Sequence, residues 1–360
     1  MAKNSTIRKN WPKYVLQWGT LAALIFFLSG LAVKLFPKMT PANPEAYCPF
    51  GGLEALATYA QRGSLPCSMT TMQILMGIVL AAAVIFLSKL FCAYLCPIGT
   101  IEDLLIKARK ALKINAINIK NGSVADKILR IFKYGLLFWI VYMTVSSSEL
   151  FCKNIDPYYA VATGFKGEIT LWMSLTALGL VVLLGFIINR FWCKYICPLG
   201  AVLNTLKFWT WLVALALLWW ALSALGLKLS WVWLLGAFCV VGYLLEIFHS
   251  KPKLQIMHVL IDQDSCGRKC YSCQKNCPYS IDVPSFGEKV TSVDCTLCGE
   301  CVASCPSQAL RIGVAPSAKG CKFSKFIPPV VTAVLLALAA VLVVLAIVRF
   351  GQARRERRAP

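Results

Sequence analysis

Closely spaced cysteines in the last third of the chain are the residues best suited to do chemistry. From Cys295 the chain reads "CTLCGECVASCP", with gaps of two, two and three residues between successive thiols. Three such thiolates can hold one cubane cluster, while the fourth, before proline, ligates a neighbouring cluster. A second run, "CGRKCYSCQKNCP", begins at Cys266 and has three residues in its first gap. The sequence therefore predicts two [4Fe–4S] clusters.

The spacing divides these eight thiols into two ligand sets, each with three cysteines from one run and the last cysteine of the other. The sets are Cys266, Cys270, Cys273 and Cys305, and Cys295, Cys298, Cys301 and Cys277. Short β-prone segments at 259–262 and 309–314 flank the runs and suit a small α+β ferredoxin-like domain. Zinc on the same thiols is the alternative, but the Cys-Pro that closes each run favours clusters.

A different cysteine pair occurs twice. "FCAYLCPIGTIEDLL" begins at Phe91 and "FWCKYICPLGAVLNTL" at Phe191. Residues four apart share a helix face, so we expect Cys92 with Cys96, and Cys193 with Cys197, to direct two thiols each to one point. Four such thiols could bind a third metal centre. A redox-active dithiol or transient metal site is one alternative, and buried inert thiols are the other, since cysteine is often a small hydrophobe. The inert interpretation is strongest for Cys239.

The segments that precede these pairs carry further candidates. "YCPFGGLEALATY" contains Cys48 and Glu54, and "FCKNIDPYYA" contains Cys152 and Asp156. The two cysteines could join a metal site or form an outer pair. Glu54 and Asp156 could accept protons from a quinol, and the alternative for each carboxylate is helix capping.

Long apolar stretches must position these residues. The 360 residues are 58% hydrophobic, whereas a soluble domain is roughly 45–50% apolar. About 20 apolar residues cross a bilayer, and we predict seven spans, near 14–36, 72–91, 133–148, 170–191, 208–225, 230–248 and 327–350. The predicted fold is an all-α membrane bundle with an inserted two-cluster α+β domain.

The net charge of +21 fits membrane topology better than nucleic-acid binding, because the basic residues lie beside apolar segments. Eight Lys and Arg lie between 107 and 133, and cytoplasmic loops are rich in such residues. We therefore place the cysteine pairs and the ferredoxin-like region on the cytoplasmic side. The chain has two histidines, His249 and His258, and no Cys-x-x-Cys-His, so we expect no haem.

The repeated pairs indicate an internal duplication. We expect a membrane core at 1–207 built from two pseudo-symmetric helix pairs, a helical hairpin at 208–249, the ferredoxin-like domain at 250–325, and a terminal helix with a basic tail at 326–360.

Together, "YCPFGGLE", the two Cys-x-x-x-Cys-Pro motifs and the double ferredoxin motif resemble the polyferredoxin membrane proteins of the NapH and NosR type. The resemblance covers most of residues 15–315. It implies an iron–sulfur subunit of the bacterial inner membrane that links the quinone pool to partner redox subunits, most simply by oxidising quinol. The flavin-binding extracellular domain of NosR-like proteins is not expected here.

Two other functions compete with this one. An assembly or copper-reducing factor of the CcoG type would use the Cys-x-x-x-Cys pairs to bind or reduce copper. A structural anchor for a reductase would need the clusters only for folding.

Overall fold

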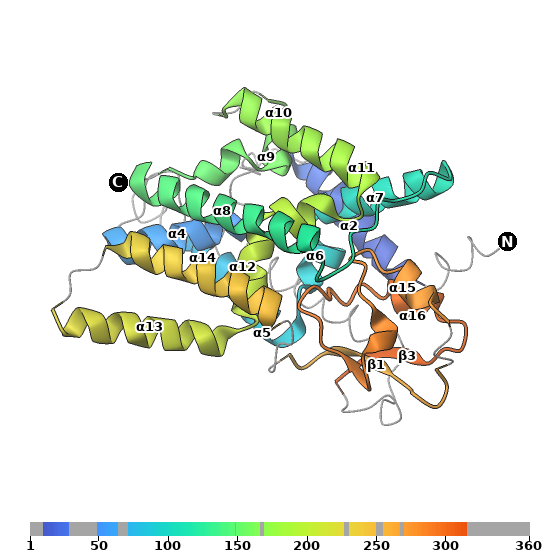
Figure 1. Cartoon of the computed structure of the whole chain (residues 1–360). Coiled ribbons are helices and arrows are strands. Elements are labelled where there is room, and N and C mark those ends of the chain that lie inside the picture. The colour runs from blue at the N-terminus through green and yellow to red at the C-terminus, as the bar shows by residue number, and fades with distance from the viewer. Residues whose placement is uncertain are drawn as a thin grey trace, which may run out of the picture.

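The apolar excess of the sequence is concentrated in helices. The computed structural model describes residues 10–28, 49–63, 71–147, 149–165, 169–226, 230–249, 255–266 and 270–314 (Figure 1). The helical elements are α2 (Trp11–Leu28), α4 (Pro49–Arg62), α5 (Thr71–Leu87), α6 (Leu90–Tyr94), α7 (Pro97–Ala111), α8 (Val124–Ser147), η2 (Phe151–Asn154), α9 (Pro157–Ala162), α10 (Leu171–Gly179), η3 (Leu180–Leu184), α11 (Gly185–Ile187), η4 (Trp192–Ile196), α12 (Pro198–Leu206), α13 (Trp209–Ala224), α14 (Trp231–Phe248), α15 (Ser272–Lys275), η5 (Val283–Ser285) and α16 (Glu300–Ser304). The strands are β1 (His258–Ile261), β2 (Lys289–Val290) and β3 (Leu310–Gly313).

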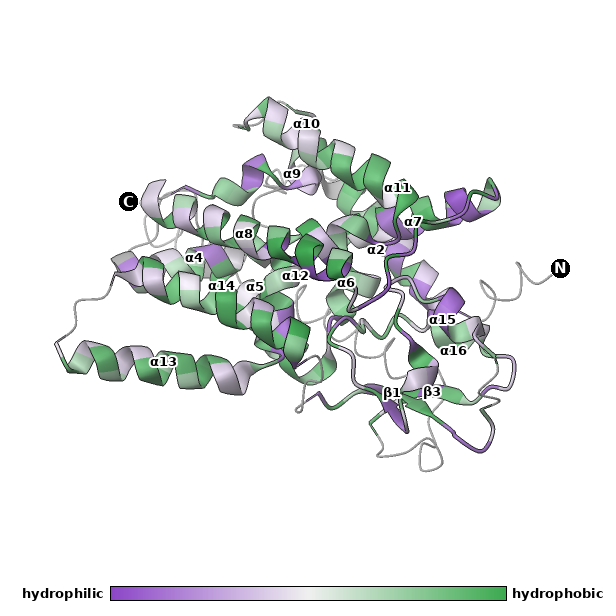
Figure 2. Cartoon of the chain, viewed as in Figure 1, coloured by the Kyte–Doolittle hydropathy of each residue, from purple (hydrophilic) through white to green (hydrophobic). Residues whose placement is uncertain are grey.

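Two helices of the described part, α8 and α14, are long and apolar enough to cross a membrane. Helices α12 and α13 would make a third span together, although they meet at a bend of 89°. No side chain of α13 is buried, and a helix that is apolar all round suits a lipid environment. Figure 2 shows this helix with green hydrophobic segments between paler bands, set apart from the bundle.

The seven predicted spans are therefore only partly represented. The spans near 72–91 and 170–191 correspond to shorter apolar helices, Gln73–Leu87 and Leu171–Ile187. Helix α2 ends at Leu28, which is the last described residue of the first predicted span, and the span at 327–350 lies outside the described residues. The number of crossings and their orientation stay predictions.

The polar part of the chain folds around a small antiparallel sheet with strand order β2-β1-β3. Val259 of β1 pairs with Val290 of β2 and with Ile312 of β3. Two of these strands fall in the segments whose β propensity the sequence indicates. The apolar core behind the sheet also includes Leu90, Ala93 and Tyr94 of α6. The sheet region therefore packs directly against the membrane core, while the predicted domain boundaries stay predictions.

A buried ionic cluster joins the two parts. Arg130 of α8 pairs with Asp126, with Glu246 of α14, and with Asp294 just before the second cysteine run, at 2.7 Å from Arg130 Nη2 to Asp294 Oδ2. Lys133 also reaches Glu246, at 2.6 Å. Arg109, Arg130 and Lys133 are all buried. Part of the basic charge between 107 and 133 thus supports packing, and does not lie in a solvated cytoplasmic loop.

Candidate functional site

The cysteines of the ferredoxin-like region border two small pockets. The inner cluster pocket, next to the membrane core, has a volume of ≈ 20 Å³ and is lined by the four thiols of Cys277, Cys295, Cys298 and Cys301. The outer cluster pocket, also ≈ 20 Å³, is lined by Cys266, Cys270, Cys273 and Cys305. These groups coincide with the two ligand sets that the spacing predicts. As predicted, each pocket has three thiols from one cysteine run and the last thiol of the other run. Ligation itself stays a prediction.

Short loops with unusual backbone angles bring the inner thiols together. Leu297 and Gly299 adopt left-handed φ values of 55° and 76°, which turn the chain sharply between Cys295 and the start of α16. Cys301 lies on α16, and Cys305 follows the helix with an extended backbone before Pro306. A residue before proline is driven out of helical geometry, so Cys305 ends α16 at the ligand, whereas α15 ends at Lys275, two residues before Cys277.

The donor sets fit iron–sulfur clusters. Apart from the hydroxyls of Tyr279, Thr296 and Ser307, the described residues of both linings are thiols and apolar groups, with no carboxylate or imidazole among them. Among the residues that the structure describes, no three His, Cys, Asp or Glu side chains are close enough to hold a single metal ion. Burial raises the pKa of Cys277 to about 12 and raises the pKa of Cys295 and Cys298. Cluster assembly would therefore have to displace protons from neutral thiols.

The repeated pairs differ from their predicted helical arrangement. Cys92 lies on α6 and Cys193 on the π-helical turn η4, but Cys96 and Cys197 lie beyond these turns as the N-caps of α7 and α12. Their ψ angles are 123° and 115°. The expectation that each pair shares one continuous helix face was wrong, because Pro97 and Pro198 force the preceding cysteine into an extended conformation.

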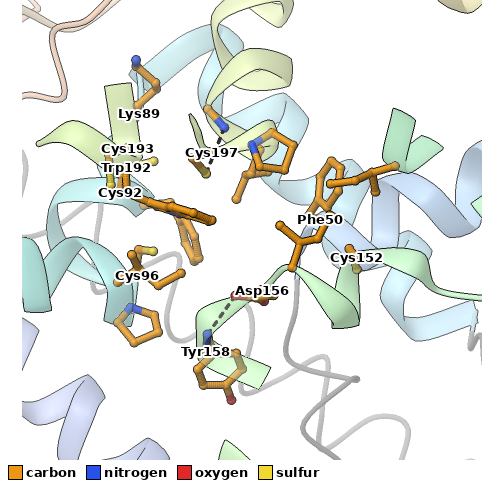
Figure 3. A pocket seen from close by; sticks show the side chains of 18 of the residues that line it. Phe50, Lys89, Cys92, Cys96, Cys152, Asp156, Tyr158, Trp192, Cys193 and Cys197 are labelled. Atoms are coloured by element: carbon orange, nitrogen blue, oxygen red, sulfur yellow. Dashed lines mark hydrogen bonds between the residues drawn. The ribbon is translucent and has the colours of Figure 1, made fainter. Parts of the chain in front are cut away.

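The four thiols nevertheless border one space, the thiol cavity, with a volume of ≈ 100 Å³. Its lining is mostly apolar and includes Phe50, Phe91, Trp192, Leu199, Cys92, Cys96, Cys193, Cys197 and Cys152, with Lys89, Asp156, Tyr158 and Tyr279 as the polar contributors. Figure 3 shows Cys92, Cys96 and Cys193 on one side of this cavity and Phe50 and Cys152 on the other. The duplication thus brings both pairs to one place, as the sequence predicts.

Electrostatics bear on the alternatives for these thiols. Burial raises the pKa of Cys92, Cys193 and Cys197, and raises that of Cys96 to about 12. Nearby Lys89 and Arg190 offset only part of this effect at Cys92. A reactive dithiol needs a lowered pKa, so the redox-active interpretation loses support. A metal, which deprotonates its thiol ligands outright, and an inert thiol both remain compatible with these values.

The two candidate proton acceptors differ. Asp156 lines the thiol cavity and also caps α9, accepting a hydrogen bond of 3.0 Å from the Tyr158 backbone N–H. Glu54 lies within α4, is 1% exposed, and lies beside Cys152 and Thr144. Burial raises the pKa of Glu54 to about 8, and Cys152 and Thr144 offset only part of the shift. Helix capping thus applies to Asp156.

The other cysteines are spread out. Cys152 is buried on η2 and borders the thiol cavity, and Cys239 is buried within α14 away from all three spaces. Cys48 lies outside the described residues. The structure therefore gives no pairing of Cys48 with Cys152.

Contacts between the repeats and the second cysteine run hold the inner cluster pocket against the core. The Ser88 hydroxyl donates to the Cys295 carbonyl at 2.6 Å, and the Tyr94 hydroxyl donates to the Leu297 carbonyl at 3.1 Å. Lys207 donates to the Val293 carbonyl at 2.8 Å. These bonds fix the loop that carries Cys295 and Cys298 next to the first repeat.

Sequence reasoning missed three residues between the cavity and this pocket: Lys89, Arg190 and Tyr279. Lys89 and Arg190 each stand three positions before the first cysteine of their motif. That repeated basic residue was a readable signal, but nothing in the spacing indicated that Tyr279 would pack between them.

The comparisons with known proteins agree with this geometry. A family described as a 4Fe-4S binding domain matches residues 69–115 and 170–211, so each match contains one Cys-x-x-x-Cys-Pro motif. YccM of Escherichia coli is 25% identical over 271 residues, covering 74% of this chain and 62% of YccM. The ferredoxin-type protein NapH of the same organism is 25% identical over 276 residues, 73% of each chain. No solved structure matches.

A third relative, the protein NirI of Paracoccus denitrificans, is 29% identical over 213 residues, covering 59% of this chain and 24% of NirI. The chain spans 62% and 63% of two of the relatives it matches, about three fifths of their length. Duplicated 4Fe-4S matches on a helical framework make the chain similar to ferredoxin-type iron–sulfur proteins. More particularly, the chain groups with the polyferredoxin proteins of the NapH and NosR type, as its motifs predict.

Proposed function

We propose that this protein is a membrane electron-transfer subunit that oxidises quinol at the thiol cavity and passes the electrons through its ferredoxin-like region to a partner redox protein. The observation that carries the proposal is the thiol cavity itself. It is ≈ 100 Å³ in volume, has a mostly apolar lining with Asp156 in its wall, and shares Tyr279 with the inner cluster pocket.

Oxidation of a quinol to a quinone releases two electrons and two protons. A quinol site needs an apolar slot for the ring and a group that takes protons. Phe50, Phe91 and Trp192 supply apolar walls. Asp156 in the cavity wall is the first proton acceptor. Glu54 is not among the described residues that line the cavity but lies next to Cys152, which does, and would take the second proton. A buried carboxyl whose pKa is about 8 can exchange a proton near neutral pH.

The eight ferredoxin cysteines would hold two [4Fe–4S] clusters, in the two sets described above. When bound, such clusters accept and release single electrons. Cys270 is exposed, whereas Cys295 and Cys301 are buried. The inner pocket therefore faces the membrane core and the outer pocket faces solvent, so we expect the partner to dock over Cys270.

Cys92, Cys96, Cys193 and Cys197 would hold a third metal centre at one side of the same cavity. Four thiols from two repeats form a soft donor set by type, and since no three of them are close enough to hold a single ion, an iron–sulfur cluster fits them better. This same donor set favours one rival function, binding or reduction of copper, and the two are separable by experiment.

The test uses the purified full chain under anaerobic conditions. A short-chain quinol should reduce the clusters, seen as the appearance of their electron paramagnetic resonance signal, with the quinone formed in step. Asp156→Asn and Glu54→Gln should slow this reduction while iron content and reduction by dithionite stay unchanged. A chain whose clusters dithionite reduces and quinol does not would contradict the proposal.

Reduction of copper(II) distinguishes the proposed function from the rival metal-handling function. The proposal expects copper(II) to be reduced no faster by the intact chain than by the Cys92→Ser, Cys96→Ser variant. Copper reduction that depends on this pair, without quinol oxidation, would favour the metal-handling function.

A further inference from the structure

Tyr279 lies between the two spaces that matter for electron transfer. It follows Cys277 and Pro278, is 4% exposed, and lines both the thiol cavity and the inner cluster pocket. Among the residues that the structure describes, no other contributes to the lining of both. Its position is also fixed by its backbone, since the Tyr279 carbonyl accepts from Asn121 Nδ2 at 3.3 Å.

Two cations flank the Tyr279 ring. Lys89 Nζ lies 5.7 Å from the ring centroid, and Arg190 Cζ lies 5.6 Å from it, both within the range of cation–π attraction. Lys89 and Arg190 occupy the same position of the two repeats. The duplicated element therefore presents one cation from each copy to a single aromatic ring of the ferredoxin-like region.

Both cations are buried, and each pairs with one carboxylate, Lys89 with Asp294 at 3.7 Å and Arg190 with Asp103. Lys89 is 4% and Arg190 1% exposed. Arg190 Nη2 donates to Asp103 at 2.5 Å, but its Nε and Nη1 have no hydrogen-bond partner in the described residues. Burying a charge with unsatisfied donors is unfavourable. Positive charge beside a redox site favours the state with the extra electron, and the carboxylates of Asp294 and Asp103 offset part of this charge.

We propose that Tyr279 forms the electronic contact between the thiol cavity and the inner cluster pocket, and that Lys89 and Arg190 are positioning residues that hold its ring and raise the reduction potential beside it. The inference rests on the proposed electron-transfer function. One electron passes from a donor in the thiol cavity to an oxidised acceptor held by the four inner thiols. Tyr279 stays a neutral phenol throughout, so no bond forms or breaks at it and no proton moves.

The first test separates an aromatic contact from simple packing. The full cluster-loaded chain is mixed with a short-chain quinol in a stopped-flow instrument, and in parallel with dithionite. Tyr279→Leu should slow quinol-driven cluster reduction at least tenfold, leaving the dithionite rate, iron content and cluster spectrum unchanged. Tyr279→Phe, which keeps the ring, should stay within about twofold of the unaltered chain.

Tyr271 provides the matched control. It belongs to the same region but is 54% exposed and lines neither the thiol cavity nor the inner pocket, so Tyr271→Leu should have no effect in either arm. If Tyr279→Leu is reduced by quinol as fast as the unaltered chain, or if the dithionite rate and iron content fall in parallel, Tyr279 is a packing residue and the proposal is wrong.

The second test needs no quinol and stands even if the proposed function fails. A mediated potentiometric titration measures the midpoint potential of each cluster. Lys89→Met should lower the midpoint potential of the inner cluster by about 59 mV, which corresponds to a tenfold change in its one-electron reduction equilibrium. The potential of the outer cluster should change less. Lys89→Arg should restore it, and Arg190→Lys should leave it nearly unchanged. Equal potentials in Lys89→Met and the unaltered chain would overturn the role of the cations.

Discussion

Both cysteine-rich regions bring sets of four thiols together, but they do so in different ways. The ferredoxin-like region takes all its thiols from short loops and short helices within one continuous segment and surrounds two spaces of ≈ 20 Å³. The thiol cavity takes its four thiols from two distant repeats and surrounds ≈ 100 Å³, with aromatic walls and an aspartate besides. The first arrangement leaves room for a ligand held by sulfur alone. The second leaves room for a ring as well, so it is the better place for substrate.

The largest expected effect is a loss of iron when single cysteines of the two regions are replaced. Cys295→Ser should lose one cluster, about four of the irons, because serine replaces a ligand of the inner pocket. Cys239→Ser, buried in α14 away from all three spaces, is the control and should lose none. Iron and acid-labile sulfide analysis gives the count.

The same count decides whether the thiol cavity holds a cluster. A third cluster predicts about twelve irons in the intact chain and about eight in the Cys92→Ser, Cys96→Ser variant. About eight irons in both would contradict a third cluster and leave the cavity to substrate alone.

The second largest effect should come from Arg130, which couples the two regions. Arg130→Met leaves Asp126, Glu246 and Asp294 with one cation fewer in a buried cluster. Breaking a buried ionic network by removing one partner costs about 3–5 kcal/mol. The variant should lose protease resistance between the core and the second cysteine run. Lys120→Met, exposed on the neighbouring loop, should not, and equal resistance in both variants would contradict this coupling.

The ferredoxin ligand sets were readable from sequence because local spacing decides them. Gaps of two and three residues and the closing proline act within a few residues of each thiol. The convergence of Cys92 and Cys193 was predictable from the duplication alone. Neither argument could predict the ion pair between Arg130 and Asp294. These residues are distant in the chain, and their pairing depends on how helix α8 packs against the second cysteine run.

The prediction about helix faces failed for a local reason. Spacing of four residues suggests one helix face, but the proline after Cys96 and Cys197 changes the backbone of those cysteines. The seven-span prediction counted apolar length only. The span predicted at 208–225 begins at the bend of 89° between α12 and α13 and corresponds to α13.

A smaller effect should distinguish the two repeats. A Cβ on Gly99 would overlap the Cys92 carbonyl oxygen, whereas a Cβ on Gly200 would lie 3.0 Å from the Cys193 carbonyl oxygen. Gly99→Ala should therefore displace Cys92 and destabilise the fold by about 1–3 kcal/mol, the usual cost of overpacking. Gly200→Ala should cost less. Thermal unfolding of both variants in the same detergent measures the difference, and equal costs would show that the two repeats pack alike.

The smallest expected effect is a pH dependence of the stability of the sheet in the ferredoxin-like region. His258 of β1 is 6% exposed, its Nδ1 has no partner in the described residues, and burial lowers its pKa to about 4, with Lys289 and Lys207 adding to the shift. An unfolded histidine has a pKa of about 6.5, so below that pH the unfolded state binds more protons than the folded state. Stability of the sheet should fall as pH falls from about 6.5 to about 4, by about 1 kcal/mol after solvent screening.

Hydrogen exchange of the strand amides at pH 7 and pH 5 measures the His258 effect. His258→Gln should remove part of the pH dependence, while His249→Gln, at an exposed helix end, should leave it unchanged. The comparison of variants is needed because carboxylates and thiols also respond to pH, and their contribution is common to all three chains. If His258→Gln and the unaltered chain lose protection equally between pH 7 and pH 5, the buried histidine does not set the acid limit of the sheet, and that limit lies with the Arg130 cluster and its carboxylates.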